Sequence, residues 1–276
     1  MVGDMAVNRL GFGAMRITGD GIWGPPSDPE AARAVLRRAV ELGVNFIDTA
    51  DAYGPNVSEQ LIYEALSPYP RGLVIATKGG LTRPGPNQWV PDGSPAHLRA
   101  ACEESLRRLH LERIDLYQLH APDSKVPFED SIGELVRLRQ QGKIRHIGVS
   151  NVTLAQFKQA HALVPVVSVQ NRYNLSDRSS EDVLQYCAAA RVAFLPWGPL
   201  GGRASPRLAP WESAAERIAN AHSVSSAQVA LAWLLGHSPA LLPIPGTSSI
   251  AHLEDNVAAA GLQLSPAELQ QLQQLS

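Results

Sequence analysis

The chain has 276 residues, of which 45% are hydrophobic and 18% are charged, so it can bury a sizeable core. Its 24 basic and 26 acidic residues give a net charge of −2, so the composition offers no support for nucleic-acid or membrane-surface binding. A small-molecule substrate is therefore the expected partner, and the sequence points to no particular protein partner.

Targeting, disulfide and metal signals are not found. No apolar run approaches the roughly 20 residues that a membrane span needs, and the N-terminal MVGDMAVNRL lacks the basic start and apolar stretch of a signal peptide. Cys102 and Cys187 are the only cysteines and have neither disulfide-framework nor zinc spacing. We expect a cytoplasmic protein without a metal site.

Eight short apolar or β-branched runs predict strands, and segments with helical spacing separate them. The Ser94–Pro95 pair predicts an N-cap and first helical residue, and Gly43 and Gly142 predict helix ends. Strands without clean polar alternation, alternating with helices, are typical of a parallel sheet covered on its outer face. The predicted strands are residues 10–15, 45–50, 73–78, 114–120, 144–150, 166–170, 192–197 and 241–245.

Eight strand–helix units favour an α/β fold of one closed (β/α)8 TIM barrel, forming a single domain over residues 1–276. The alternative is an open doubly wound sheet that uses GFG at 11–13 as a nucleotide loop. That motif is weak, because Arg16 occupies the sixth position of the would-be GxGxxG and no helix opens directly after it. The Pro- and Gly-rich stretches 83–95 and 198–212 are expected to be long loops that follow strands.

Polar side chains stand at the ends of three consecutive predicted strands. Asp48 ends the second strand and Tyr53 follows it, Lys78 ends the third, and His120 ends the fourth. Each alone has an ordinary explanation as a solvated, structural or packing residue. Because the carboxyl ends of barrel strands meet at one mouth, we expect all four to lie together.

These four groups suit proton transfer to an oxygen. A phenol has a reference pKa of about 10, so Tyr53 needs help to act as an acid. A nearby Lys78 ammonium would lower that pKa, and Asp48 would keep the lysine charged and oriented. His120 would donate a hydrogen bond to an oxygen bound beside Tyr53. Protonation of a carbonyl oxygen is useful when hydride arrives at its carbon.

Three segments, GVNFIDTADAYG, VIATKGG and DLYQLHAPD, resemble the catalytic segments of the aldo-keto reductase superfamily. The resemblance extends over essentially the whole chain. It implies a (β/α)8 barrel that binds a nicotinamide cofactor without a Rossmann motif and reduces an aldehyde or ketone. It assigns the catalytic tetrad to Asp48, Tyr53, Lys78 and His120.

Further segments resemble the family's cofactor site. Trp197 in PWGPLGG would stack on the nicotinamide. Ser150 and Asn151 would hydrogen-bond the carboxamide, but either could instead simply cap the next helix. Many relatives carry a lysine and an arginine where this chain has Gly246 and His252, so we expect NADPH as the cofactor and keep NADH as the alternative. By resemblance the nicotinamide would be held by Ser150, Asn151, Gln170 and Trp197, the pyrophosphate by Gly198 and Leu200, and the adenosine phosphate and adenine by Gly246, Thr247, Ser248, His252, Asp255 and Asn256.

Other functions stay open on the sequence alone. Lys78 at a strand end would also suit a Schiff-base lyase or aldolase, although Asp48 would keep its amine protonated. A metal-dependent hydrolase is less favoured, because Asp48 and His120 lack the further histidine or aspartate ligands that such a metal centre requires. A reductase-like barrel can also act as a cofactor-binding regulatory partner with little turnover.

Two features concern the substrate and the remaining acid. Trp23, Trp89 and the segment 204–212 offer apolar surface near the mouth, which favours an apolar or aromatic carbonyl compound. The resemblance gives Asp51 no catalytic part, and we expect it to order the loop or to be solvated.

Overall fold

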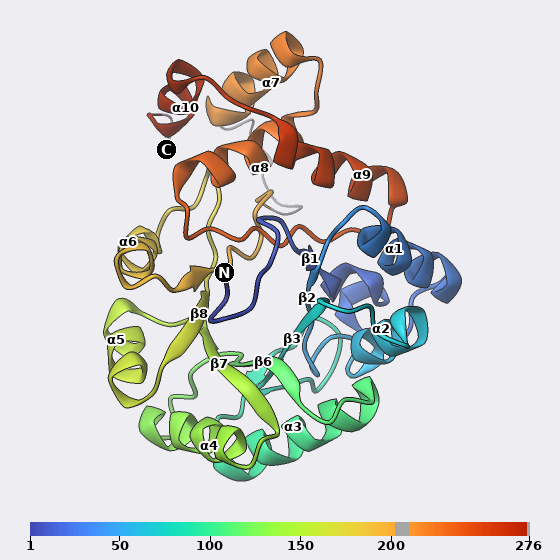
Figure 1. Cartoon of the computed structure of the whole chain (residues 1–276), viewed down its shortest axis with the longest axis vertical. Coiled ribbons are helices and arrows are strands. Elements are labelled where there is room, and N and C mark those ends of the chain that lie inside the picture. The colour runs from blue at the N-terminus through green and yellow to red at the C-terminus, as the bar shows by residue number, and fades with distance from the viewer. Residues whose placement is uncertain (202–209, 275–276) are drawn as a thin grey trace.

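The computed structural model describes residues 1–201 and 210–274, and a curled parallel sheet lies at its centre (Figure 1). Every neighbouring pair of strands in this sheet runs parallel. The strand order is β1 (Phe12–Gly13), β2 (Phe46–Asp48), β3 (Val74–Gly79), β6 (Ile114–Leu119), β7 (Ile144–Ser150), β8 (Val166–Gln170) and β9 (Ala193–Phe194).

The eighth strand position is filled by an extended segment at 241–245. On one side Leu242 donates a hydrogen bond to the carbonyl of Phe194 (2.9 Å). On the other side, main-chain N–H groups in and before β1 donate to the carbonyls of Pro243 (2.9 Å) and Pro245 (3.2 Å). The two prolines have no N–H to return, so half of this ladder is missing and no regular strand forms. The segment nevertheless closes the barrel, which confirms the (β/α)8 prediction over the open doubly wound sheet.

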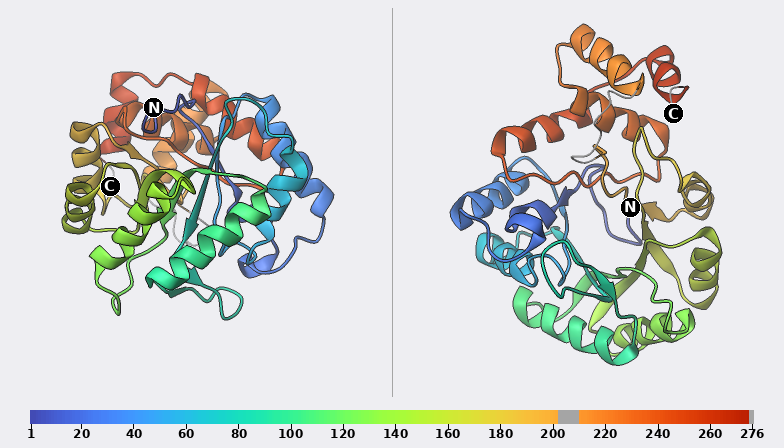
Figure 2. Two further views of the ribbon diagram at one scale, coloured as in Figure 1. Left: turned by 60° about the horizontal axis from the view of Figure 1, so that its bottom comes forward. Right: turned by 180° about the vertical axis from the view of Figure 1, so that it is seen from behind.

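Most of the helices surround the sheet, and the further views show the same arrangement tilted and from behind (Figure 2). Helix α3 begins as predicted, because the Ser94 hydroxyl accepts from the N–H of His97 and Pro95 is its first residue. Gly43 and Gly142 have φ of +87° and +74°, the left-handed conformation expected at helix ends. The helices are α1 (Pro29–Glu41), α2 (Val57–Leu66), α3 (Pro95–Leu109), α4 (Phe128–Gln140), α5 (Leu154–Leu163), α6 (Glu181–Ala190), α7 (Pro210–His222), α8 (Ser226–His237), α9 (Ile250–Ala258) and α10 (Pro266–Gln273).

Two segments differ from the expected elements. The first strand is shorter than residues 10–15, since a 3-10 helix, Ala14–Ile17, follows β1 directly. Within the expected loop 83–95 the chain forms part of an antiparallel ribbon, β4 (Leu81–Thr82) with β5 (Val90–Pro91). Of the other expected loop, 198–212, residues 202–209 lie outside the described part.

Alternation along the strands divides the barrel interior into an apolar and a polar part. The apolar part contains inward-facing residues such as Phe46, Val74 and Leu116, and Val2 and Met5 of the N-terminal segment pack against it. Further along β2, β3 and β6, two residues after Phe46, four after Val74 and two after Leu116, the same face carries Asp48, Lys78 and Gln118, all buried. The fold therefore collects buried polar groups at the carboxyl ends of the strands. Among the described residues, no helix has both the length and the apolar composition that a bilayer span requires.

Candidate active site

Lys78 is the centre of the polar group at the strand ends. Its side chain is fully buried, and Nζ donates to Oδ2 of Asp48 (2.7 Å), to the carbonyl of Thr49 (2.8 Å) and to the hydroxyl of Tyr53 (3.1 Å). These three acceptors use all the donors of an ammonium group. Lys78 therefore holds the phenol of Tyr53 in a fixed place.

The second oxygen of Asp48 is held from the opposite side of the barrel. Oδ1 accepts from Nε2 of Gln170 (2.7 Å) and from Nε2 of Gln118 (3.2 Å), while Oε1 of Gln118 accepts from the hydroxyl of Ser168 (3.3 Å). A Cβ atom added at Gly148 would lie 2.3 Å from that hydroxyl, so only glycine leaves room for this chain of hydrogen bonds. Gln118 was not predicted from the sequence, although a polar residue two positions before His120 in a buried strand is a usable signal.

Aromatic edges surround the phenol. The rings of Tyr53 and His120 lie 5.7 Å apart at 84°, and Trp89 lies 6.2 Å from Tyr53 and 6.3 Å from His120. All three residues line the same cavity. The phenol and the imidazole therefore face one space in which a small molecule can bind.

Burial and charge set the protonation states of these groups. Burial raises the pKa of Tyr53, and although the Lys78 ammonium acts in the opposite direction, as predicted, the net shift is upward and the phenol is protonated at neutral pH. Burial tends to lower the pKa of Lys78, but the charges of Asp48 and Tyr53 outweigh it and leave the pKa raised. Burial, together with Lys78 and Arg83, holds the pKa of His120 well below its ordinary value, so its imidazole is neutral.

Asp51 is buried rather than solvated, with 8% of its surface exposed. Its main chain orders the loop, because its N–H donates to Lys78 and its carbonyl accepts from Asn56. Oδ1 is buried and has no hydrogen-bond partner among the described residues. Burial and the charge of Glu59 raise the pKa of this carboxyl to about 8, so the solvated interpretation is wrong and the loop-ordering one holds.

Asp51→Asn is expected to become more stabilising, relative to the unchanged protein, as the pH rises. The folded state keeps the Asp51 proton up to about pH 8, whereas an unfolded carboxyl releases it near pH 4, so the free energy of unfolding falls across that range. The asparagine variant lacks this loss of up to about 1.4 kcal/mol per pH unit. Urea unfolding of both proteins at pH 5, 7 and 8 measures the difference between their free energies of unfolding. A difference between the two proteins that does not change with pH would contradict the assignment.

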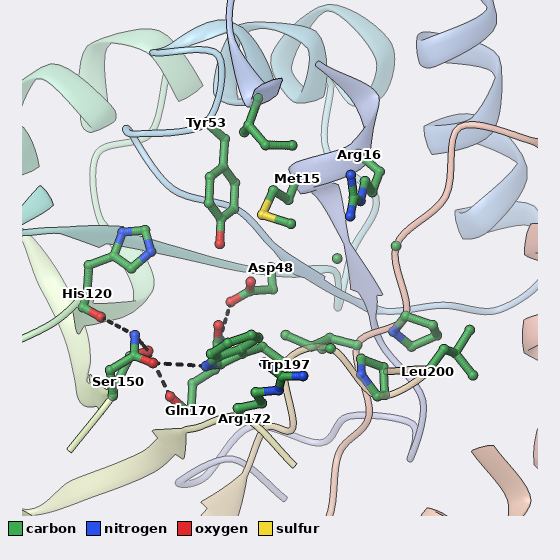
Figure 3. A pocket seen from close by; sticks show the side chains of 18 of the residues that line it. Met15, Arg16, Asp48, Tyr53, His120, Ser150, Gln170, Arg172, Trp197 and Leu200 are labelled. Atoms are coloured by element: carbon green, nitrogen blue, oxygen red, sulfur yellow. Dashed lines mark hydrogen bonds between the residues drawn. The ribbon is translucent and has the colours of Figure 1, made fainter. Parts of the chain in front are cut away.

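The cavity above Lys78 has a volume of about 510 Å³ and receives residues from most of the strand ends (Figure 3). This size is typical of a small-molecule or cofactor site. Lys78 itself lies beneath the cavity and does not line it. The predicted residues that line it are Asp48, Tyr53, His120, Ser150, Asn151, Gln170, Trp197, Gly198, Leu200 and Gly246.

One wall of the cavity is a chain of hydrogen bonds that ends at an indole ring. The Ser150 hydroxyl donates to the carbonyl of Gln170 (2.7 Å), Nδ2 of Asn151 donates to the carbonyl of His120 (2.9 Å), and Nε1 of Trp197 donates to Oδ1 of Asn151 (3.0 Å). The capping interpretation of Ser150 and Asn151 is wrong, because the residue that caps α5 is a threonine two positions further on. Trp197 is 36% exposed. It therefore offers a positioned ring to a ligand.

Gly246 allows the closing segment to approach β1. A Cβ atom at Gly246 would lie 2.4 Å from the carbonyl oxygen of Gly13, and one at Gly13 would lie 2.6 Å from the carbonyl of Ile244. No larger side chain, lysine included, fits at 246 without moving the backbone. Positive charge instead reaches the cavity from Arg16 and Arg172, which line it and which were not predicted as site residues (Figure 3).

The remaining predicted cofactor residues do not line the cavity and lie just before α9 or within it. Ser249 caps this helix, and Thr247 is buried with its hydroxyl accepting from the N–H of Ser249 (3.0 Å). Their contacts with an adenosine group stay a prediction. The residues concerned are Thr247, Ser248, His252, Asp255 and Asn256.

Of the apolar surface expected near the mouth, Trp89 lines the cavity and Trp23 does not. The centre of the Trp23 ring lies 5.8 Å from the guanidinium of Arg83. Residues 204–209 of the third expected piece lie outside the described residues. The confirmed part of that prediction is an aromatic wall made by Trp89 beside Tyr53 and His120.

The Aldo/keto reductase family model matches residues 9–276. The chain belongs to the aldo/keto reductase family. It is therefore an NAD(P)H-dependent oxidoreductase, which confirms the resemblance found in the catalytic segments.

Two curated proteins and one solved structure are similar to this chain over most of their length. An uncharacterized oxidoreductase of Schizosaccharomyces pombe is 54% identical over 264 residues, which cover 96% of this chain and 85% of the relative. The pyridoxine 4-dehydrogenase of Escherichia coli is 43% identical over 283 residues, covering 100% of this chain and 97% of the relative. A solved aldo/keto reductase of Klebsiella pneumoniae, in complex with NADP and acetate, has a TM-score of 0.84 and 30% identity, covering 99% of this chain and 93% of that one.

Proposed function

We propose that this aldo/keto reductase uses NADPH to reduce an aromatic aldehyde of the pyridine type, with pyridoxal as the first candidate. The geometry that carries the proposed chemistry is the Tyr53 hydroxyl held 3.1 Å from the buried Nζ of Lys78. The substrate class is supported by the aromatic wall at Trp89 and by full-length similarity to a pyridoxine 4-dehydrogenase, whose name denotes oxidation of the corresponding alcohol.

The lining fits a nicotinamide cofactor. Nε2 of Gln170 donates to Asp48, which turns its carbonyl oxygen away from that carboxylate and leaves it to accept from an amide. Trp197 presents an indole ring at the cavity wall, and Arg16 and Arg172 bring positive charge for phosphate groups. In this proposal Ser150, Asn151 and Gln170 hold the carboxamide, Trp197 stacks on the ring, and the main chain at Gly198, Leu200 and Gly246 lies beside the phosphates.

The proposed reduction moves one hydride and one proton. NADPH, when bound, supplies the hydride to the carbonyl carbon. Tyr53 donates its phenolic proton to the carbonyl oxygen as the double bond opens, and Lys78 stabilises the phenolate that remains. His120, neutral because burial and nearby cations lower its pKa, donates one ring N–H to the same oxygen and polarises the carbonyl. The phenolate then regains a proton from solvent.

The structure supports hydride transfer over Schiff-base chemistry at Lys78. A Schiff base requires a free, accessible amine. Nζ of Lys78 is fully buried, donates to three oxygens, and has a raised pKa, so its amine is charged and closed to a carbonyl carbon. A product trapped on Lys78 by borohydride would reverse this ranking.

NADPH is expected to bind at least about tenfold more tightly than NADH, because a charge-assisted contact to the additional phosphate is worth about 1.5–3 kcal/mol. Titration of the purified protein by quenching of tryptophan fluorescence measures both dissociation constants. Equal constants would show that this chain, with Gly246 and His252, does not discriminate the 2′-phosphate.

A carbonyl panel tests the proposed function itself. Oxidation of NADPH is followed with pyridoxal, benzaldehyde, propanal and a simple ketone. We expect turnover with pyridoxal and benzaldehyde to exceed turnover with propanal. NADPH binding without turnover on any member of the panel would favour the regulatory-partner alternative.

A further inference from the structure

Arg83 lies behind the aromatic wall and connects three segments of the mouth. Only 9% of its surface is exposed. Its guanidinium donates to three main-chain carbonyls: Nε to Gln88 (2.7 Å), Nη1 to Ala52 (2.8 Å) and Nη2 to Gly21 (3.0 Å). These carbonyls belong to the connection between β4 and β5, the loop after β2, and the 3-10 segment Asp20–Ile22. One side chain therefore sets the relative positions of three loops.

Each of these carbonyls belongs to the residue directly before one that lines the cavity. The three lining residues are Trp89, Tyr53 and Ile22. The guanidinium also lies over the ring of Trp89, with its central carbon 3.6 Å from the ring centre. Arg83 thus fixes both the backbone before Trp89 and one face of its indole.

The charge of Arg83 is buried without an acidic partner. Within the described residues none of its hydrogen bonds goes to a carboxylate. A guanidinium stays charged in proteins, and burying it costs free energy unless hydrogen bonds and an aromatic face compensate. A lysine would carry the same charge but not the planar fork that reaches three carbonyls while stacking on a ring. The site therefore depends on the shape of the side chain as well as on its charge.

We propose that Arg83 is a positioning residue for the substrate: it holds Trp89 as an aromatic wall beside Tyr53 and His120, and thereby selects flat aromatic aldehydes over small aliphatic ones. The proposal rests on the carbonyl reduction proposed above. Its geometric basis is that Trp89 stands at 82° to the ring of Tyr53 and at 64° to that of His120. A flat ring bound against the indole would be oriented relative to the proton donor.

Three variants test the proposal: Arg83→Met, Arg83→Lys and Trp89→Leu. All three are expected to lower kcat/KM for pyridoxal and benzaldehyde by about tenfold or more, mainly through KM, and to change it for propanal by less than about twofold. The dissociation constant of NADPH should not change. Because lysine lacks the fork, Arg83→Lys should resemble Arg83→Met, which separates shape from charge. Arg37→Met, at an exposed ion pair on α1, is the matched control and should behave like the unchanged protein.

Fluorescence gives a second measurement that does not depend on turnover. The emission of Trp89 is obtained as the difference between the unchanged protein and Trp89→Leu, and then between Arg83→Met and the double variant. We expect this component to shift to longer wavelength without Arg83, as the ring loses its cover. Unchanged emission would overturn the proposal, as would an equal loss of kcat/KM for all aldehydes. If no aldehyde is reduced at all, the proposed function fails, and the emission of Trp89 alone decides whether Arg83 holds the ring. If Arg83→Met does not fold, the comparison uses Arg83→Lys.

Discussion

Tyr53→Phe is expected to reduce turnover by about a thousandfold or more while leaving NADPH affinity unchanged, because general acid catalysis typically contributes 10²–10⁴. The substitution removes only the hydroxyl and keeps the ring contacts with Trp89 and His120. Lys78 keeps its acceptors on Asp48 and Thr49, so the buried ammonium remains largely satisfied. Single-turnover oxidation of bound NADPH measures the step directly.

Tyr63→Phe is the matched control, since it removes a hydroxyl from a ring that stacks on His110 outside the cavity. It should retain full turnover. Rapid single-turnover oxidation by Tyr53→Phe would show that another group, such as His120, supplies the proton. Weaker NADPH binding by that variant would instead place the phenol in cofactor binding.

The barrel could be predicted because each strand carries its own local signal. Seven predicted strands reappear in the sheet, since buried parallel strands need continuous apolar runs whatever their neighbours are. The eighth position shows the limit of this reasoning. Pro243 and Pro245 in LLPIP prevent a regular ladder, yet their carbonyls still accept from β1, and that outcome depends on where β1 lies in the folded chain.

That Asp48, Tyr53, Lys78 and His120 lie together was predictable for a related reason. Topology alone brings strand ends to one mouth, so residues at the ends of consecutive strands meet. Gln118 and Arg83 were not predicted, because their partners are determined by tertiary packing. Gln118 contacts Asp48 only across the barrel, and Arg83 reaches three carbonyls on three separate segments.

The pKa values at the site depend on how deeply each group is buried, and the sequence does not give the extent of burial. The expected effect of Lys78 on the pKa of Tyr53 has the right sign, but burial exceeds it. Burial also determines the state of Asp51. A solvated Asp51 was one expectation from the sequence, but the residue is buried and its carboxyl keeps its proton at neutral pH. Asp48, which pairs with the Lys78 ammonium, thus lies three residues before a carboxyl that is neutral because it is buried.

Lys78→Met is expected to destabilise the fold by about 3–5 kcal/mol as well as to abolish turnover, because it leaves the Asp48 carboxylate buried without its cation. Gln170 and Gln118 would still donate to that carboxylate, but neither brings a charge. The same substitution at Lys143, which pairs with Glu103 near the surface, is the control and should cost less than about 1 kcal/mol. Urea unfolding of both variants gives the two values.

Adding Asp48→Asn to Lys78→Met separates stability from catalysis. With the carboxylate removed, the substitution of Lys78 no longer leaves Asp48 as a buried charge without its cation, so the double variant is expected to recover much of the lost free energy of unfolding. Turnover should not recover, because nothing then stabilises the phenolate of Tyr53. If Lys78→Met alone unfolds at the same urea concentration as the unchanged protein, burying Asp48 without Lys78 does not destabilise the fold. The ion pair would then serve catalysis only, and the fold would tolerate either partner alone.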